Sequence, residues 1–586
     1  MAYDGTVLKA VIEELKNNLI NSKVEKIYQP SKEELIFNFR GNKGRYKLLI
    51  SAASNSPRVY FTDVSYENPT IPPAFCMLLR KHLENSRVLD IKQYKMDRIF
   101  KIDFLSKSEL GDLINKSLVV EIMGKHSNII LIETDTNNIY DSIKRVNSFT
   151  SRIREILPGL TYSASLISTK YNPLDPEIFE EAINNFDKNK TLKNNLINTF
   201  TGISPLISRE VTYRANLDDD RIFSSLNDEE YILFIQALKS LINQLKNNEF
   251  SPILIKSDAK IIEFSSLDLQ MFPQAEKISY DSISALLDDY YSHKEKSQAL
   301  NEKSNSLKRI VKNHLDRTVK KLEKQSEELN EAIDREKFKI YGDLISSNSY
   351  KIEKGIKSIE LENFYDNMKI ISIPLDEKLS AQQNANKYYK KYSKLKNAVG
   401  ILNNEIDVNK NKVNYLNSVL LNIELSDSIS DLEDIRDELV DMGYLKKQGR
   451  NKRQKNKKVT FLEYNSSEGY KIYAGKNNRQ NEELTLKFAR KSDMWFHVKD
   501  APGSHVILKE DGRDFSMKSI KEAAIIAAFN SSLKNSNNIE VDYTLKKNVK
   551  RHPAKMPGLV SYINYETIVI SDKDLLNLQS NKEVVN

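Results

Sequence analysis

Residues 493–508 read DMWFHVKDAPGSHVIL and hold the only tryptophan of the chain, together with two of its seven histidines. Apolar and polar side chains alternate from Met494 to Lys499, and this period of two predicts a β-strand with two different faces. The next four residues, which end at Gly503, are typical of a type II turn with a positive φ at the glycine. Residues 504–508 then return as a partner strand. The stretch therefore predicts a β-hairpin.

The polar face of this hairpin carries Trp495, with histidines beside it. No thiol and no third ligand stands at metal spacing, so a metal site is not predicted. A purely structural hairpin and a wet surface that stacks bases and holds phosphates are the two alternatives. The flanking segments GKNNRQN (475–481) and YTLKKNVKR (543–551) favour the second, because they offer amide, guanidinium and ammonium donors beside aromatic rings. The residues predicted to contact RNA are Asn477, Asn478, Arg479, Gln480, Asn481, Trp495, His497, His505, Lys547 and Arg551.

Residues 286–444 are rich in Lys, Glu, Asn and Gln and carry heptad repeats of apolar residues. These repeats run through 315–329 and again through 399–423, where Asn409 interrupts one row. Such a seam is typical of a coiled coil. A strand-like module near 345–378 separates the two halves, which predicts an antiparallel arm that folds back on itself. A plain dimeric coiled coil is the alternative.

The rest of the chain divides into five further parts. Residues 1–170 are predicted to mix helices and strands, and residues 171–285 to be mainly helical. Residues 445–458 form a basic linker without an acidic residue, which favours contact with phosphates. Residues 459–575 return to α+β, and 576–586 form a tail.

Composition sets further bounds on the chain. Its 586 residues exceed the size of one hydrophobic core, and its net charge of +8 is a mild basic bias. The single cysteine, Cys76, excludes a disulfide framework and a cysteine-rich zinc site, and its apolar setting predicts a buried thiol. The N-terminus lacks a signal-peptide pattern, and no run of about 18 apolar residues occurs. We expect a cytoplasmic protein with no membrane partner.

Several long motifs carry a resemblance to a known family. The segment GKNNRQNEELTLKFARKSDMWFHVKDAPGSHVIL (475–508) resembles the signature of NFACT-R domains. The segments ISAASNSPRVYFT (50–62), MDRIFKIDF (96–104) and EIMGKHSNIILIE (121–133) resemble NFACT-N domains. With the coiled coil between them, the chain is identified as a member of the RqcH family, the bacterial relatives of eukaryotic NEMF. One departure is KRHPAKMPG (550–558), where the family commonly has a Gly-Ala pair before Lys-Pro-Gly.

The resemblance implies an α+β multidomain fold. Its N-terminal mixed domain resembles the fold of formamidopyrimidine-DNA glycosylases, and a helical helix-hairpin-helix domain follows. A long antiparallel coiled-coil arm with a small middle module then leads to the C-terminal α+β NFACT-R domain.

The resemblance also implies ribosome-associated quality control. Family members bind the obstructed large (50S) subunit that carries peptidyl-tRNA. They recruit alanine tRNA for mRNA-independent C-terminal alanine tailing, which marks stalled chains for degradation. The expected partners are rRNA and ribosomal proteins of the 50S subunit, tRNA, and a small RNA-binding co-factor of the pathway. Peptide bonds form on the ribosome, so no catalytic residue, cofactor or metal is expected in this chain.

The family's tRNA-binding Asp-Arg pair matches Asp97 and Arg98. The Arg98 guanidinium suits a bidentate clamp on a phosphate or a guanine edge. Without the family, an Asp-Arg pair on a strand is usually a surface ion pair. Arg145 is a further expected tRNA contact. Gly124 permits a turn in GKHSN (124–128) that offers Lys125 and His126 as phosphate donors, and a plain hairpin turn is the alternative. Gly202 resembles the family's helix-hairpin-helix, whose turn amides can hold a phosphate.

Two other functions compete with this hypothesis. A DNA glycosylase of the formamidopyrimidine type needs an N-terminal proline nucleophile and a cysteine zinc finger. The chain starts Met1-Ala2-Tyr3-Asp4 and has one cysteine, so it offers neither the proline nucleophile nor the zinc finger, and glycosylase activity is not expected. A fibronectin-binding surface adhesin is the second alternative, since family members have carried that label, and it would need unconventional export.

Overall fold

The computed structural model describes residues 3–107, 111–149, 151, 154–163, 169–257, 260–447 and 460–575. The chain forms two compact units, residues 1–295 and 296–586. Most of the predicted basic linker and the whole predicted tail lie outside the described residues. Within the described residues, no helix is both long and apolar enough to cross a membrane.

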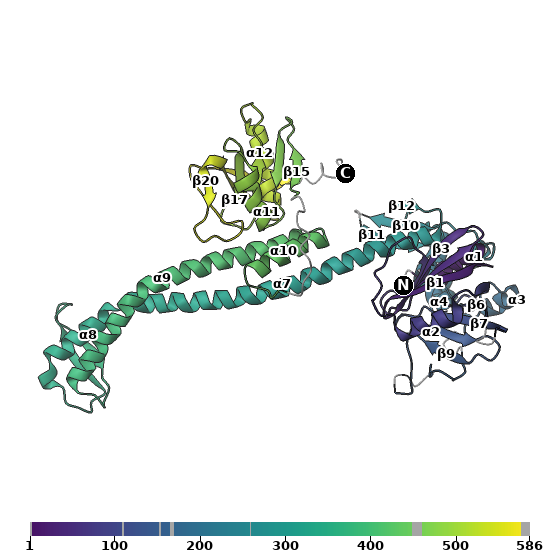
Figure 1. Ribbon diagram of the computed structural model, residues 1–586, viewed down its shortest axis with the longest axis horizontal. Coiled ribbons are helices and arrows are strands. Elements are labelled where there is room, and N and C mark those ends of the chain that lie inside the picture. The colour runs from purple at the N-terminus through teal and green to yellow at the C-terminus, as the bar shows by residue number, and fades with distance from the viewer. Residues whose placement is uncertain are drawn as a thin grey trace. The chain divides into compact units, whose positions relative to one another are not determined.

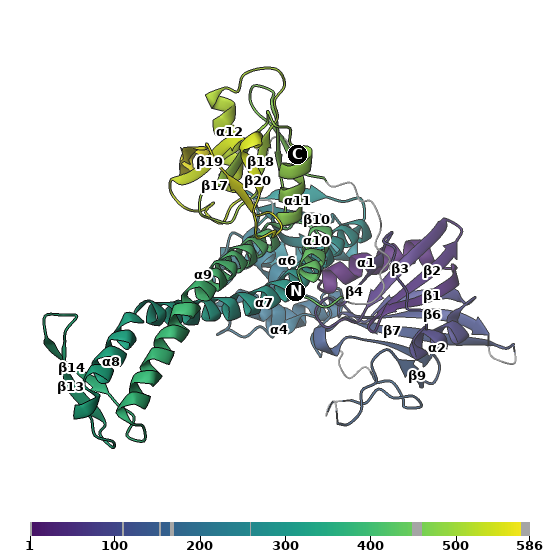
Figure 2. The same ribbon diagram turned by 60° about the vertical axis from the view of Figure 1, so that its left-hand side comes forward.

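In the described part of the first unit, nine antiparallel strands form one sheet in the order β4-β3-β2-β1-β5-β6-β7-β8-β9. Helices α1 (Gly5–Leu19) and α2 (Ala74–Leu83) pack on it, as Figure 2 shows for α1. The predicted buried thiol is confirmed, because Cys76 on α2 is buried. The strands are β1 (Lys23–Ser31), β2 (Glu34–Gly41), β3 (Gly44–Ser51), β4 (Arg58–Phe61), β5 (Arg87–Gln93), β6 (Ile99–Lys107), β7 (Leu113–Glu121), β8 (Asn128–Glu133) and β9 (Ile139–Ser142).

Asp97 and Arg98 lie on the turn between β5 and β6, whereas the sequence placed them on a strand. The turn forms because Tyr94 pairs with Ile99 across the strand ends and the amide of Asp97 donates to the Tyr94 carbonyl at 2.9 Å. Lys95 adopts a positive φ of 52° to close it.

A helical layer follows the sheet and ends in a second, small sheet. The prediction that residues 171–285 are mainly helical is wrong for residues 253–257, 260–265 and 276–279, which form three strands in the order β11-β10-β12. Ile253 and Ile255 point into the helical core and Leu254 into the core of the large sheet. Because both faces are buried, the apolar run shows no alternation that separates strand from helix. The elements are α3 (Pro176–Asn184), α4 (Leu192–Thr199), α5 (Pro205–Arg214), α6 (Asp228–Lys246), β10 (Ile253–Ser257), β11 (Lys260–Ser265) and β12 (Glu276–Ser279).

Two long helices, α7 (Ile283–Ile333) and α9 (Ala381–Leu425), run side by side (Figure 1), and α7 begins in the first unit and continues into the second. They are antiparallel, because Lys308 pairs with Glu424 at 3.4 Å while Gln325 accepts a hydrogen bond from Asn409 at 2.6 Å. At their far end lie α8 (Glu336–Ser347) and the hairpin of β13 (Ser358–Asn363) and β14 (Lys369–Pro374). The hairpin falls within the segment near 345–378 that was predicted as a small module, and most of α8 lies before it. Helix α10 (Ile429–Asp441) packs back on α9.

The C-terminal domain is built on a six-stranded antiparallel sheet in the order β15-β16-β18-β17-β19-β22, with α12 (Met517–Phe529) on one face. Helix α11 (Asn478–Glu483), a π-helical turn (Leu484–Phe488) and the β20–β21 hairpin cover part of the other face. The strands of the six-stranded sheet are β15 (Leu462–Asn465), β16 (Lys471–Ala474), β17 (Met494–Val498), β18 (Val506–Leu508), β19 (Ile539–Leu545) and β22 (Glu566–Ile570). The separate hairpin consists of β20 (Val549–Arg551) and β21 (Val560–Tyr562).

The predicted hairpin is confirmed, since Trp495 pairs with Ile507 between β17 and β18. The predicted type II turn is wrong. Asp500 takes the positive φ, 52°, and Gly503 does not. Gly503 instead forms an isolated antiparallel bridge with Ser531, so the connection is held by a distant segment rather than by a local turn.

Candidate nucleic-acid interface

Asp97 and Arg98 line a pocket of about 240 Å³ in the first unit. The start of α1 and the turn before α5, which carries Gly202, line the same pocket. Two predicted positions from separate parts of the sequence are thereby brought together. The lining residues are Asp4, Gly5, Asp97, Arg98, Lys170, Phe200, Thr201, Gly202, Ile203, Ser204 and Pro205.

Two glycines let the backbone segments around this pocket approach one another. Gly202 has a φ of 78°, and a Cβ atom there would collide with the Met96 carbonyl. A Cβ atom on Gly5 would collide with the same carbonyl. Any side chain at either position would therefore push the Arg98 turn away from α1 and α5. The turn predicted at Gly202 is present, and its contact with a phosphate stays a prediction.

Asp4 ties the first turns of α1 and α5 together. One carboxylate oxygen accepts from the amides of Thr6 at 2.9 Å and Val7 at 3.1 Å, which caps α1. The other oxygen accepts from Ser204 Oγ at 2.5 Å, and Ser204 is the N-cap of α5. Burial raises the pKa of the Asp4 carboxyl, and these hydrogen bonds act against that shift.

The turn that carries Arg98 is held by side chains next to it. Asp97 Oδ1 accepts from the amide of Arg98 at 2.8 Å, and Gln93 Nε2 donates to the carbonyls of Asp97 at 2.9 Å and Gly5 at 3.2 Å. Arg98 and Lys170 bring positive charge to a pocket where two helices begin, and the N-terminal ends of helices add positive potential. The carboxyl groups of Asp4 and Asp97 line the same pocket and offset part of this charge. Such an arrangement can hold a phosphate.

The other predicted tRNA residues of this unit lie elsewhere on its surface. Lys125 and His126 are exposed on a 3-10 turn between β7 and β8, and Gly124 opens that turn with a φ of 57°. Arg145 is exposed and donates to both oxygens of Asp141, at 2.9 and 2.7 Å, which raises the pKa of Arg145. Among the described residues, none of these lines the pocket with Arg98.

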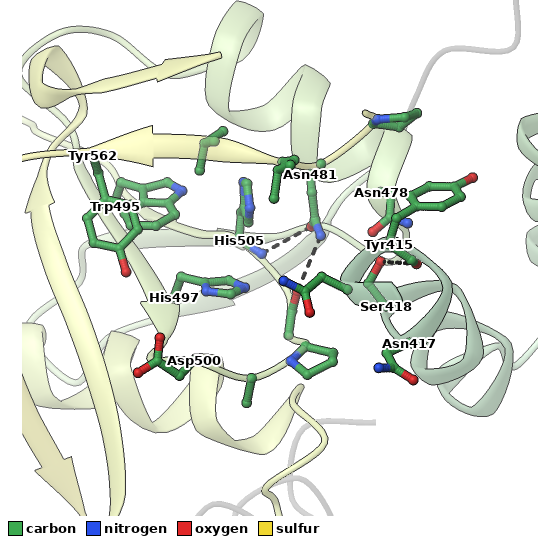
Figure 3. Close-up of a pocket in the computed structure, with 18 residues that line it drawn as sticks. Tyr415, Asn417, Ser418, Asn478, Asn481, Trp495, His497, Asp500, His505 and Tyr562 are labelled. Carbon is green, nitrogen blue, oxygen red and sulfur yellow. Dashed lines mark hydrogen bonds between the residues drawn. The ribbon is translucent and has the colours of Figure 1, made fainter. Parts of the chain in front are cut away.

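A second pocket, of about 380 Å³, lies in the second unit between the C-terminal domain and α9 (Figure 3). It contains the tryptophan and both histidines of the opening hairpin. The lining residues are Asn414, Tyr415, Asn417, Ser418, Asn478, Asn481, Trp495, His497, Asp500, Ala501, Pro502, Gly503, His505, Pro557, Gly558, Leu559, Val560 and Tyr562.

The amide-rich segment upstream is buried and bonds mainly to protein groups. Asn477 caps α11 by accepting from the amide of Gln480 at 2.9 Å. Asn481 accepts from the amide of His505 at 3.1 Å and donates to the Gly503 carbonyl at 3.4 Å. These side chains position the loop that forms the pocket wall.

Asn478 and Arg479 join α11 to the arm. Asn478 Nδ2 donates to Glu438 on α10 at 3.1 Å, and Tyr415 of α9 donates to the same carboxyl at 2.9 Å. Burial raises the pKa of Glu438. Arg479 forms an ion pair with Asp441. The amide segment is therefore also the contact through which the domain packs on α9 and α10.

The expectation of a wet face around Trp495 is wrong. The indole is 0% exposed and packs with Leu484, Ile507 and Val549, with the Tyr562 ring at 4.8 Å. The alternation of the strand predicts two faces, and both faces are covered. The second cover comes from the π-helical turn and from β20–β21.

The two histidines stand beside the indole with lowered basicity. Trp495 and His497 stack at 5.8 Å, and the His505 ring meets each of them edge-on at 5.3 Å. Burial lowers the pKa of His497, and burial together with the neighbouring His497 lowers the pKa of His505 well below its usual value. His505 Nδ1 shares a hydrogen bond of 2.8 Å with Thr485 Oγ1. Both rings are therefore neutral near pH 7.

Lys547 and Arg551 are exposed, as an RNA contact requires, and Arg551 forms an ion pair with Glu482. Sequence reasoning missed Asp4 and Lys170 in the first pocket and Tyr415 and Asn417 in the second. Asp4 carried a local signal, since an Asp before a helical stripe is typical of an N-cap. The α9 residues carried none.

Comparison with known proteins covers the chain from end to end. The family model for NFACT N-terminal and middle domains matches residues 4–458, and the model for the NFACT protein RNA binding domain matches residues 458–562. The chain belongs to the RqcH/NEMF family of NFACT proteins.

Its NFACT relatives include the Rqc2 homolog RqcH of Bacillus subtilis, 34% identical over 574 residues that cover 97% of this chain and 98% of that protein. RqcH of Streptococcus pneumoniae serotype 2 is 33% identical over 575 residues, with the same coverage of each chain. Among solved structures, the N-terminal part of the fibronectin/fibrinogen-binding protein from Streptococcus suis is 30% identical. It covers 50% of this chain and 99% of that one, at a TM-score of 0.42.

Proposed function

We propose that this NFACT protein is a ribosome quality-control factor. It binds the 50S subunit obstructed by peptidyl-tRNA and recruits alanine tRNA, so that the stalled chain receives a C-terminal alanine tail without mRNA. The observation that carries this proposal is the end-to-end match to RqcH proteins, which covers 97% of this chain.

The pocket around Arg98 supports the tRNA part of the proposal. The backbone of the Arg98 turn is held by Asp97 and Gln93, so the turn itself needs little ordering when the Arg98 side chain meets a phosphate or a base edge. Lys170 and the starts of α1 and α5 add positive potential at the same place. Asp97 adds an acceptor for a base amino group. Lys125, His126 and Arg145 would contact more distant parts of the tRNA.

The remaining parts take supporting roles in this proposal. The paired helices α7 and α9 act as a coiled-coil arm that reaches across the subunit, and the exposed Lys547 and Arg551 contact RNA. Peptide bonds form at the ribosome's own centre. The chain therefore binds and positions substrates and performs no bond chemistry.

Replacing Arg98 tests the proposal. Wild-type protein purified from cells under ribosome-stalling conditions should carry 50S rRNA and a tRNA pool enriched in alanine tRNA, read by RNA sequencing. Arg98→Ala should reduce the tRNA recovered by about tenfold or more, because a charge-assisted hydrogen bond contributes about 1.5–3 kcal/mol. Arg87→Ala is the matched control, since Arg87 is an exposed arginine on β5 that lines neither pocket.

Recovery of 50S rRNA with normal tRNA from Arg98→Ala would reject this pocket as the tRNA site. Absence of both 50S rRNA and tRNA from the wild type would reject the function itself.

A further inference from the structure

The indole nitrogen of Trp495 is a buried hydrogen-bond donor that lacks an acceptor among the described residues. It belongs to a side chain that is 0% exposed. Buried polar groups are nearly always paired, so an unpaired one calls for an explanation. Trp495 lines the second pocket, and Figure 3 shows its nitrogen on the side of the ring that faces His505 and the pocket interior. A ligand that accepts a hydrogen bond there would satisfy it.

The groups around the pocket suit an uncharged ligand. His497 and His505 are neutral, because burial lowers the pKa of both. Asn414 and Asn417 line the α9 side, and within the described residues neither has a hydrogen-bond partner. Of the described lining residues none is Lys or Arg, and the one acid is Asp500. A phosphate inside the pocket would meet no cation and one carboxylate, so the interior disfavours anions.

The pocket has the size and the lining for a small aromatic ligand. Its volume of about 380 Å³ falls in the range of small-ligand sites. The partly exposed Tyr562 ring lies at one end, packed against the buried indole of Trp495 with the two rings tilted by 48°. Amide side chains are well suited to base edges, because they offer a donor and an acceptor side by side. An aromatic wall with amides opposite is the chemistry of a nucleobase site.

A basic surface adjoins the pocket. Pro557 to Val560 line the pocket and lead into strand β21 of the β20–β21 hairpin. The same hairpin exposes Lys550 and Arg551, and its loop exposes Lys555. Phosphates on either side of a base held in the pocket would lie toward these cations, outside the uncharged interior.

We propose that this pocket binds one unpaired nucleobase of an RNA strand, with the indole nitrogen of Trp495 donating to the base and the flanking phosphates lying on the β20–β21 hairpin. The proposal rests on the proposed function only in that the partner is RNA. It adds a site in the other unit of the chain and a recognition mode that reads a base taken out of a helix or loop.

The full-length protein reports on this pocket directly, because Trp495 is its only tryptophan. Single-stranded RNA of about 12 nucleotides, made of uridine, adenosine or cytidine, is added while tryptophan emission is recorded. The same ribose-phosphate backbone without bases is the matched probe. We expect a saturable change in emission with at least one of the base-containing strands and none with the abasic strand. Fluorescence anisotropy of end-labelled RNA measures total binding in parallel.

Filling the pocket gives the second arm of the test. Asn417→Phe places a ring in the pocket from α9, and Asn404→Phe puts the same ring on an exposed position of the same helix outside it. Asn417→Phe should weaken the emission response about 10- to 100-fold in RNA concentration, as expected for losing one stacked base. Asn404→Phe should match the wild type.

Equal responses to abasic and base-containing RNA would overturn the proposal, and so would an unchanged response in Asn417→Phe. Binding by anisotropy without any change in emission would also overturn it and would leave RNA binding elsewhere intact. None of these results bears on whether Arg98 recruits tRNA, so the two proposals fail separately.

Discussion

Single residues in the amide segment explain why a run that looks like an RNA contact is mostly structural. Gly475 lies where a Cβ atom would be 2.9 Å from the amide nitrogen of Asn481 and closer still to its side-chain oxygen. The missing side chain lets Asn481 reach the backbone of His505 and Gly503. The glycine and the amide thus act together to set the loop beside Trp495.

Gly475→Ala should destabilise the C-terminal domain by about 1–3 kcal/mol, because the added methyl overpacks the contact with Asn481. Thermal unfolding followed by tryptophan emission measures this domain alone. The matched control is Gly400→Ala on α9, where nothing lies within 4 Å of the added Cβ. It should raise the stability of the helix by about 0.5–1 kcal/mol, read by circular dichroism. Equal effects of the two substitutions would contradict this account.

The buried His505 predicts a pH dependence of stability with a definite sign. Burial lowers the pKa of His505 in the folded state, so the unfolded chain, with its usual value of about 6.5, takes up a proton first as the pH falls. The folded domain therefore has its full stability above about pH 6.5 and loses stability below it. His505→Gln should flatten this loss.

The quantity to compare is the free energy of unfolding of wild type minus that of His505→Gln at each pH, measured by urea unfolding followed by tryptophan emission. This difference is needed because burial raises the pKa of Glu438, which acts in the opposite direction. His126→Gln, at an exposed position, should follow the wild type. The test compares about pH 7.5 with about pH 5.5, which lie roughly one unit above and below the usual histidine pKa. The prediction is refuted if the difference in unfolding free energy between wild type and His505→Gln is the same at both pH values.

At the scale of elements, a polar layer interrupts the apolar seam of the arm. Asn409 and Gln325 are 3% and 4% exposed, and Asn409 Nδ2 donates to Gln325 Oε1 at 2.6 Å. Gln325 in turn donates to Glu405. A satisfied polar pair in an apolar seam fixes the register of two helices, because any slide would leave both groups buried and unpaired.

Asn409→Leu should destabilise the arm by about 1–3 kcal/mol, since Gln325 Oε1 loses its partner in a buried place. The double variant Asn409→Leu with Gln325→Leu should recover the wild-type stability or exceed it, at the expense of register. Circular dichroism on thermal unfolding gives the stability of the full set of variants. Additive losses in the double variant would show that the pair is not coupled.

Secondary-structure elements were predictable from the sequence where a local pattern determines them. The prediction failed where contacts with distant segments determine the structure. The strands around Phe100 and the β17–β18 hairpin follow from alternation alone. The strand at Ile253–Ser257 could not be predicted in this way, because both of its faces are buried and its apolar residues do not alternate with polar ones. The burial of Trp495 depends on β20–β21, more than 50 residues away along the chain. The positive φ at Asp500, in place of Gly503, goes with a bridge from Gly503 to Ser531 that no local signal indicates.

At the scale of the molecule, the two pockets lie in different units and differ in the charged groups that line them. The Arg98 pocket combines cations with helix starts and suits phosphate. Among its described lining residues the Trp495 pocket has no Lys or Arg and one carboxylate, Asp500, so it suits a base better than a phosphate. Sequence motifs indicated both neighbourhoods, while the meeting of Arg98 with Gly202, and of Trp495 with α9, needed the folded chain. Two separate contacts of different chemistry fit a factor that must hold RNA at more than one point.

The most direct test of the central claim is mass spectrometry of a stalled reporter chain in cells. The reporter is translated from an mRNA without a stop codon, in cells that lack this protein, carry the wild type, or carry Arg98→Ala. The account predicts C-terminal alanine tails with the wild type, none in its absence, and few or none with Arg98→Ala. Tails that persist without the protein, or reporters that stay untailed in the presence of the wild type, would contradict it.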